Sequence, residues 1–189
     1  MITPVGIISY PSLFEPKPNP SGQLKYSCSL LFDKSDLAGI AALNEAVSKA
    51  VEKGIASLWK GKKPAFRYNP LRDGDDELKS GEKTDKVYAG KVFINCSSEQ
   101  APGVVVATGQ GPKPLLDPTA IFAGCFVRAD INPFPYSNKG NNGIGWGLNN
   151  ILLLREGPRL DGRMRATDAF AEYGVEEGET PVDESADLM

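Results

Sequence analysis

Hydrophobic and polar residues alternate along several stretches of the chain. Residues 24–33 alternate most clearly, with Tyr26, Cys28 and Leu30 on one face, which is typical of a half-buried strand. Further strands are predicted over residues 2–14 with a kink at Pro11, 88–98, 104–107, 122–131 and 144–154. The chain therefore has at least five strands of short to medium length.

One longer stretch follows helical spacing instead. Apolar residues from Leu37 to Leu58 recur at helical intervals, and Ser35 or Asp36 can cap the first turn, which predicts an amphipathic helix of about 22 residues. Residues 65–90 show no regular pattern, and residues 133–143 are rich in glycine and asparagine, as in a hairpin loop. The predicted fold is mainly β with one main α-helix, arranged as a small closed β-barrel.

Charge divides the chain into two parts. Residues 166–189 contain eight carboxylates and no basic residue, whereas residues 1–165 hold all 21 basic residues and 16 of the 24 acidic ones. The body therefore carries a net charge of +5 and the tail −8, which predicts a domain over residues 1–160 and an acidic, disordered C-terminal tail over residues 161–189.

The basic body points to nucleic acid, because Lys and Arg can displace the counterions condensed on a polyanion. The tail can fold back over that basic surface and compete with weak ligands, or it can be a solubilising segment only. The tail carboxylates expected to compete for the basic surface and to contact partners are Glu176, Glu177, Asp183, Glu184 and Asp187.

Composition argues against an enzyme, a cofactor and a bound metal. The chain has no histidine, its three cysteines match no metal spacing, and it contains no nucleotide-binding or nucleophile motif. The run Asp73, Asp75, Asp76, Glu77 is interpreted as a turn, because Thr84 stands where a calcium loop needs glutamate. A metal-dependent nuclease using these four carboxylates remains an alternative. No apolar run is long enough for a membrane helix, and reduced cysteines are typical of a cytoplasmic protein.

Aromatic and basic residues are paired along the predicted strands. Phe93 lies two residues from Lys91, and Phe126 lies two residues from Arg128, each on the face opposite the apolar one. An exposed ring can stack on a nucleobase while the neighbouring cation neutralises a phosphate, which favours single-stranded nucleic acid. The alternative is that a helix or loop covers this face, so that both rings belong to the core.

Loops and strand ends supply further pairs of the same kind: Lys25 with Tyr26, Lys60 with Trp59, Arg67 with Phe66 and Tyr68, and Lys139 with Phe134 and Tyr136. Three lysines, Lys60, Lys62 and Lys63, also follow Trp59 at the helix end, where they suit the helix dipole. The other candidate binding residues are Lys25, Tyr26, Arg72, Tyr136, Lys139 and Trp146.

Three segments carry a resemblance to a known family. Residues 68–75, 89–98 and 102–105, together with the acidic tail, resemble phage OB-fold single-stranded DNA-binding proteins of replication and recombination. The resemblance implies that the small β-barrel is OB-fold-like. It also implies cooperative, sequence-independent binding of single strands in the host cytoplasm, and a tail that contacts replication proteins. Related tails often end in an aromatic residue, whereas this chain ends in Met189. A phage structural or protein-interaction β-domain is the other alternative, and oligomeric state stays open.

Overall fold

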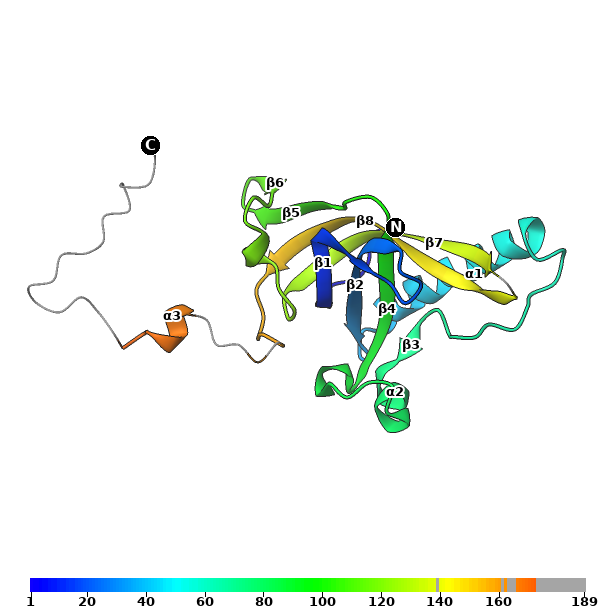
Figure 1. Ribbon diagram of the computed structural model, residues 1–189, viewed down its shortest axis with the longest axis horizontal. Coiled ribbons are helices and arrows are strands. Elements are labelled where there is room, and N and C mark those ends of the chain that lie inside the picture. Colours follow the sequence, from blue (N-terminus) through cyan, green and yellow to red (C-terminus); the bar gives the residue numbers. More distant parts are fainter. Residues whose placement is uncertain (139, 161, 163–165, 173–189) are drawn as a thin grey trace, which may run out of the picture.

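The computed structural model describes residues 1–138, 140–160, 162 and 166–172 (Figure 1). The strands are β1 (Gly6–Pro18), β2 (Leu24–Asp33), β3 (Arg72–Asp73), β4 (Lys91–Ser98), β5 (Gly103–Thr108), β6 (Gly111–Pro114), β7 (Phe126–Asn138) and β8 (Asn141–Arg155). The helices are α1 (Leu37–Ser57), α2 (Gly74–Ser80), α3 (Ala166–Ala169) and the 3₁₀ turns η1 (Lys86–Tyr88) and η2 (Pro118–Ala120). Among the described residues, no helix combines the length and apolar character that crossing a membrane requires.

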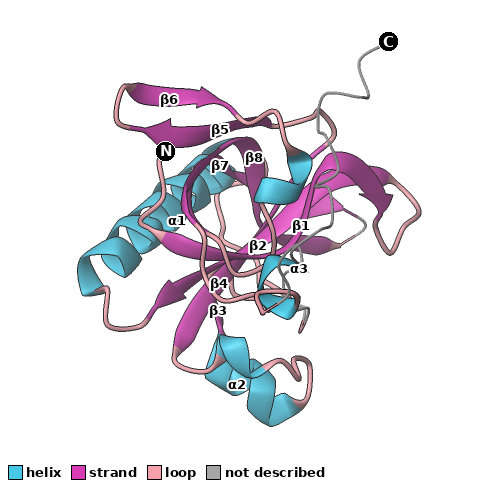
Figure 2. Ribbon diagram, turned by 90° about the vertical axis from the view of Figure 1, so that its left-hand side faces the viewer, coloured by secondary structure: helices cyan, strands magenta, loops and turns pink. Residues whose placement is uncertain are grey.

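Five of the strands close into a barrel (Figure 2). The sheet runs β3-β4-β2-β1-β7-β8-β5-β6, and a parallel pairing of β4 with β8 joins its two halves. The closed circuit is therefore β1-β2-β4-β8-β7, and the hairpin of β5 and β6 extends the sheet outside it. A five-stranded Greek-key barrel of this kind is the OB-fold, as the sequence predicts.

The barrel interior is filled by the apolar faces that alternation predicted. Cys28 and Leu30 of β2, Ile94 and Cys96 of β4, and Val127 of β7 are all buried in one cluster. Cys28 and Cys96 are direct cross-strand partners, and burial raises the pKa of the Cys96 thiol. All three cysteines are free and buried. These residues confirm the predicted strand faces of β2, β4 and β7.

The long helix α1 also follows its prediction. Asp36 caps it, accepting a hydrogen bond from the Gly39 N–H at 2.9 Å. Leu43 is fully buried in the barrel cluster, and Ala50 packs with Trp59 and Ile144 in a second cluster near the helix end. The helix thereby covers one end of the barrel and supports β7 and β8 (Figure 1).

The irregular segment 65–90 contains structure that the sequence did not reveal. The acidic run is not a turn, because Asp73 caps α2 by accepting from the Asp75 and Asp76 N–H groups. The Lys34 ammonium hydrogen-bonds Asp73 and Asp75, each at 2.7 Å. These bonds lower the pKa of both carboxyls and raise that of Lys34. Lys34 therefore ties α2 to the barrel.

The predicted hairpin loop at residues 133–143 is instead a pair of strands. Strands β7 and β8 stay paired from the partners Asn132 and Gly147 outward to the partners Asn138 and Asn141. They form a two-stranded arm beyond the barrel (Figure 1). A register shift between Asp130 and Ile131 makes Ile151 and Leu153 the buried residues at the end of β8. Strict alternation from Ile144 would instead bury Leu152 and Leu154, which are half-buried. The predicted tail contact residues lie outside the described residues.

Candidate nucleic-acid interface

A row of small polar residues crosses the outside of the barrel. Strand register places Ser12 beside Ser27, Ser27 beside Ser97, Ser97 beside Gly147, and Gly147 beside Asn132. These five residues, here called the polar row, come from five different strands. No large side chain stands in the row, so a ligand can approach the backbone closely along it.

Lysines border one side of the polar row. Lys17 of β1 and Lys25 of β2 are direct cross-strand partners, and like charges placed opposite each other repel. Lys25 has a partial counter-charge in Glu99, whose carboxylate lies 3.8 Å away. A cavity of about 400 Å³ lies over this part of the polar row, lined by Lys17 and Lys25, by Ser12, Ser27 and Ser97 of the row, and by Tyr10. An anion bound in this cavity would relieve the repulsion between the two lysines.

A series of alternating aromatic rings and cations borders the other side of the polar row. The Arg67 and Arg72 guanidinium groups each lie 5.2 Å from the Tyr68 ring centroid, and Arg72 lies 5.1 Å from that of Phe93. The Lys83 ammonium lies 5.6 Å from the Phe93 centroid and 5.5 Å from that of Tyr10. Such contacts are attractive cation–π interactions. The residues of this cation–π chain are Arg67, Tyr68, Arg72, Phe93, Lys83 and Tyr10.

The cation–π chain and the polar row run side by side across the strands. Phe93 and Ser97 point to the same side of β4, and four residues of strand separate them by about 13 Å. Ser29 and Asn95 fill the space between, joined by a 2.7 Å hydrogen bond from the Ser29 hydroxyl. The arrangement is a shallow surface with a polar centre.

Two tyrosines of the cation–π chain expose their rings. Tyr10 is 62% exposed and Tyr68 is 47% exposed. Tyr10 also has a φ of 47°, a left-handed value that is rare for a bulky residue, at a bulge where β1 gains one residue over β2. Strained backbone of this kind persists where the surroundings hold it, and it clusters at functional sites.

The arm adds two more rings at the far end of the polar row. Phe134 lies opposite Gly145 and Tyr136 opposite Gly143, and each ring covers its glycine. The Phe134 ring also approaches Gly147 of the polar row. Any side chain at Gly143 or Gly145 would clash with these rings, which explains two glycines within the strand.

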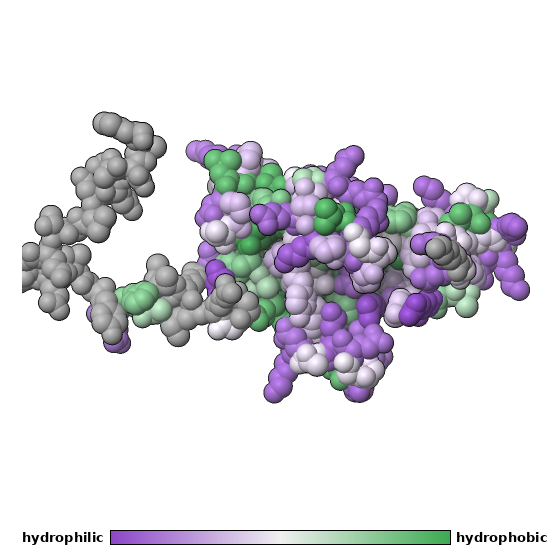
Figure 3. All heavy atoms as spheres, in the orientation of Figure 1, coloured by the Kyte–Doolittle hydropathy of each residue, from purple (hydrophilic) through white to green (hydrophobic). Residues whose placement is uncertain are grey.

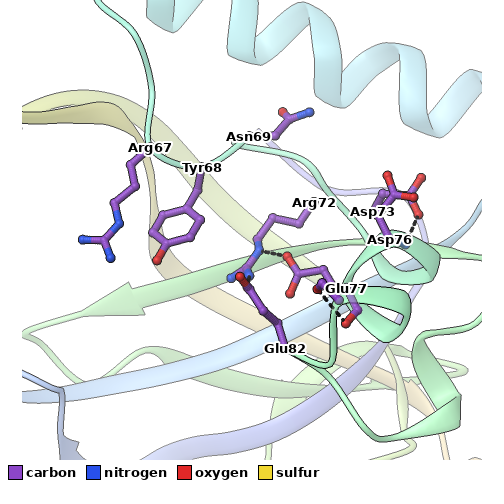
Figure 4. A pocket seen from close by; sticks show the side chains of 9 residues that line it. Arg67, Tyr68, Asn69, Arg72, Asp73, Asp76, Glu77 and Glu82 are labelled. Atoms are coloured by element: carbon purple, nitrogen blue, oxygen red, sulfur yellow. Dashed lines mark hydrogen bonds and ion pairs between the residues drawn. The ribbon is translucent and has the colours of Figure 1, made fainter.

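Arg72 sits in an acidic pocket beneath Tyr68 (Figure 4). Its guanidinium pairs with Glu77 and, at 2.9 Å, with Glu82. Figure 4 shows Glu77 on the side of the guanidinium that faces away from Tyr68, and Glu82 reaching the guanidinium from below. The predicted role of Arg72 in binding phosphate is therefore opposed by two carboxylates that already neutralise it.

Phe93 is not the exposed ring that the sequence suggested. Its side chain does point out of the barrel, but it is fully buried with Leu31 and Tyr88. Tyr88 meets it edge to face with centroids 4.9 Å apart, because η1 packs over this part of β4. The covered-face alternative therefore holds for Phe93, and the ring has no free surface for a base.

Four other candidates lie away from the polar row. Trp146 is 4% exposed inside the barrel, and its indole N–H donates to the Pro70 carbonyl at 2.8 Å. Tyr26 falls on the interior side of β2 with Cys28. Lys91 pairs with Asp33 at 2.9 Å, which lowers the pKa of that carboxyl. The Arg128 guanidinium donates to the Thr3 carbonyl at 2.8 Å.

Phe126 is covered as well, by a cation rather than by a helix. The Arg155 guanidinium lies 3.4 Å from its ring centroid. Of the predicted binding residues, Lys25 lies beside the polar row, Tyr136 lies in the arm and Arg72 is neutralised in the cation–π chain, whereas Lys139 lies outside the described residues. Sequence reasoning paired Arg67 with Tyr68 and Lys139 with Phe134, but it did not select Tyr10, Lys17 or Lys83.

One family model matches most of the chain. The model of the family described as "Enterobacter phage Enc34, ssDNA-binding protein" matches residues 2–180. No curated protein sequence gives a match.

Solved structures share the fold at low sequence identity. The single-stranded DNA-binding protein from bacteriophage Enc34 is similar with a TM-score of 0.66 and 23% identity, covering 89% of this chain and 88% of that one. The same protein in complex with ssDNA is similar with a TM-score of 0.67 and 22% identity, covering 84% of this chain and 87% of that one. The single-stranded DNA-binding protein gp2.5 encoded by bacteriophage T7 is similar with a TM-score of 0.58 and 16% identity, covering 96% of this chain and 98% of that one.

Proposed function

The chain belongs to the family of the Enterobacter phage Enc34 ssDNA-binding protein, and we propose that it binds single-stranded DNA across the polar row. OB-folds bind oligonucleotides on the face of their second and third strands and with the loops that flank it. Here those strands are β2 and β4, and the flanking elements are residues 19–23 and the arm. The observation that carries the proposal is the polar row lying between the lysines and the exposed tyrosines.

The parts of this surface suit a single strand. Bases can stack on Tyr10, Tyr68 and the arm rings Phe134 and Tyr136, which is tolerant of sequence because every base has a flat face. Lys17 and Lys25 can then neutralise phosphates. A duplex reader needs a basic recognition helix, whereas α1 has no basic residue in its last turn and exposes alanines and mixed charges.

A metal-dependent nuclease has less support. Asp73 and Asp75 are bonded to Lys34, and Glu77 to Arg72, so protein cations already occupy these carboxylates. The described residues contain no group of three or more potential ligands that could hold a metal. We therefore propose a binding protein without catalysis, which protects transient single strands during phage replication and recombination in the host cytoplasm.

Binding to a series of labelled oligonucleotides tests the proposal directly. We expect fluorescence anisotropy to show tight binding of poly-dT and of a mixed single strand, weakened by salt, and poor binding of the matching duplex. Both single strands should be recovered at full length after incubation with Mg²⁺. Equal affinity for duplex and single strand, or no binding to either, would contradict the proposed function.

The acidic tail should compete with DNA for the basic face. Removing residues 166–189 deletes eight carboxylates, so we expect tighter binding to poly-dT, by about tenfold at low salt and vanishing as salt screens the tail. The matched control keeps the tail length but replaces its acidic residues by Asn and Gln, and it should behave like the truncation. An unchanged or weaker affinity of the truncated protein would count against competition.

A further inference from the structure

The segment between α1 and β3 concentrates positive charge. No acidic residue occurs between Glu52 and Asp73. Lys60, Lys62, Lys63 and Arg67 are all exposed, and no described carboxylate lies within 4.0 Å of their charged groups. These four residues are here called the basic segment. In Figure 3, hydrophilic side chains project from the end of the molecule where Figure 1 places this turn.

The basic segment is held in a defined conformation. Lys60 has a φ of 51° and Gly61 one of 82°, and the Gly61 N–H donates to the Ile55 carbonyl at 3.0 Å. The Trp59 ring packs on Phe66 with centroids 5.4 Å apart, and both lie in the cluster with Ile144 of the arm. Both ends of the segment are therefore anchored, and its cations project from a fixed turn.

The helix dipole does not account for this charge. The effect of a dipole falls off within the last turn, and the last turn of α1 contains no basic residue. Only Lys60 lies near the helix end, whereas Lys62, Lys63 and Arg67 lie farther along the chain. An anion from outside the protein can therefore bind these cations without displacing a described carboxylate.

The basic segment continues the cation–π chain. Arg67 stacks on Tyr68, and the same pattern is repeated upstream, where the Lys63 ammonium lies 5.1 Å from the Phe66 ring centroid. The Trp146 bond to Pro70 fixes the segment beside the arm. Cations and rings thus follow one another from Tyr10, across the barrel, to Lys60.

We propose that the basic segment is a second phosphate-binding surface, on which a single DNA strand continues after it leaves the polar row. This inference rests on the proposed function. It assigns the sugar–phosphate backbone of single-stranded DNA as the ligand of Lys60, Lys62 and Lys63, and it makes the site longer than the barrel face. Short strands would fill the polar row alone, whereas longer strands would also reach the basic segment.

Strand length therefore separates the two surfaces. We expect the triple variant K60Q/K62Q/K63Q to bind an oligo-dT of about six nucleotides within twofold of wild type, because OB-fold sites span roughly 4–16 nucleotides. Binding of an oligo-dT of about 20 nucleotides should weaken at least tenfold at about 0.1 M salt. For the triple variant and the longer strand, the plot of log binding constant against log salt concentration should have a shallower slope, by about 0.7 for each phosphate that the protein no longer neutralises.

A matched variant controls for net charge. K49Q/K53Q/K113Q removes three exposed lysines from α1 and β6, and it should leave both oligonucleotides bound as in wild type. The variant K60R/K62R/K63R keeps the positive charge, so it should bind the longer oligo-dT as tightly as wild type does. Thermal unfolding of all variants should match wild type, since the lysines are exposed.

The other outcomes are distinct. If wild type binds neither oligonucleotide, the proposed function itself fails. If wild type binds both and the triple variant keeps full affinity for the longer strand, the second surface is refuted. An equal loss for both lengths, shared by the control variant, would reveal a general charge effect and overturn the proposal. A loss seen only while residues 166–189 are present would mean that the basic segment binds the acidic tail instead.

Discussion

Replacing Tyr10 and Tyr68 together by alanine is expected to weaken binding of single-stranded DNA by about 30-fold or more. Both rings are exposed, on opposite ends of the cation–π chain. Stacking contributes about 1–3 kcal/mol for each base, and each 1.4 kcal/mol is roughly a tenfold change in affinity. The effect should be similar for poly-dT and for mixed sequence, because the rings do not read base identity.

The matched control keeps the rings and removes only the hydroxyls. The variant Y10F/Y68F should bind within about threefold of wild type, since stacking needs the ring alone. Urea unfolding should give nearly the same free energy for all three proteins, because exposed substitutions usually change it by less than about 0.5 kcal/mol. An alanine variant that binds single strands like wild type at matched salt would show that the bases stack elsewhere.

Local pattern was sufficient for the elements that build the barrel. Alternation identified the buried face of β2, helical spacing identified α1, and the sequence offered Ser35 or Asp36 as the cap, of which the structure uses Asp36. Each of these features depends on residues that are neighbours in the chain. The strand order then follows from a small set of closed arrangements that short strands can form.

The arm escaped prediction because its stability comes from across the sheet. Glycine weakens a strand when considered alone, so residues 133–143 were expected to form a loop. In the structure, Phe134 covers Gly145 and Tyr136 covers Gly143, and the rings supply the packing that the glycines lack. Those pairs can be identified only once the register of β7 against β8 is known.

The binding residues were harder to predict for the same reason. Sequence reasoning looked for a ring and a cation that are close in the chain, as in Lys91 and Phe93 on a strand or Arg67 and Tyr68 in a loop. The structure instead joins Lys83 to Tyr10, which are far apart in the chain, and joins Arg72 to Phe93 by strand pairing. Alternation shows on which side of a strand a residue lies, but it does not show what covers that side.

Replacing Phe93 by alanine should therefore lower stability far more than affinity. The ring is fully buried between Leu31, Tyr88 and the cations Arg72 and Lys83. Removing a buried phenylalanine typically lowers the free energy of unfolding by about 3–5 kcal/mol, because the burial of the ring disappears and a cavity is left behind. We expect urea unfolding to show this decrease, and the folded variant to bind poly-dT within severalfold of wild type at low temperature.

The comparison with Tyr68 makes this prediction decisive, because the two rings share the Arg72 guanidinium but differ in exposure. Y68A should lose affinity and keep its stability, whereas F93A should do the reverse, and F93L should recover most of the stability because it refills much of the cavity. If F93A instead unfolds like wild type and loses affinity like Y68A, then η1 must move aside on binding and the Phe93 ring must meet a base. The structure argues against that outcome, since uncovering Phe93 would also expose Tyr88, a ring that is fully buried.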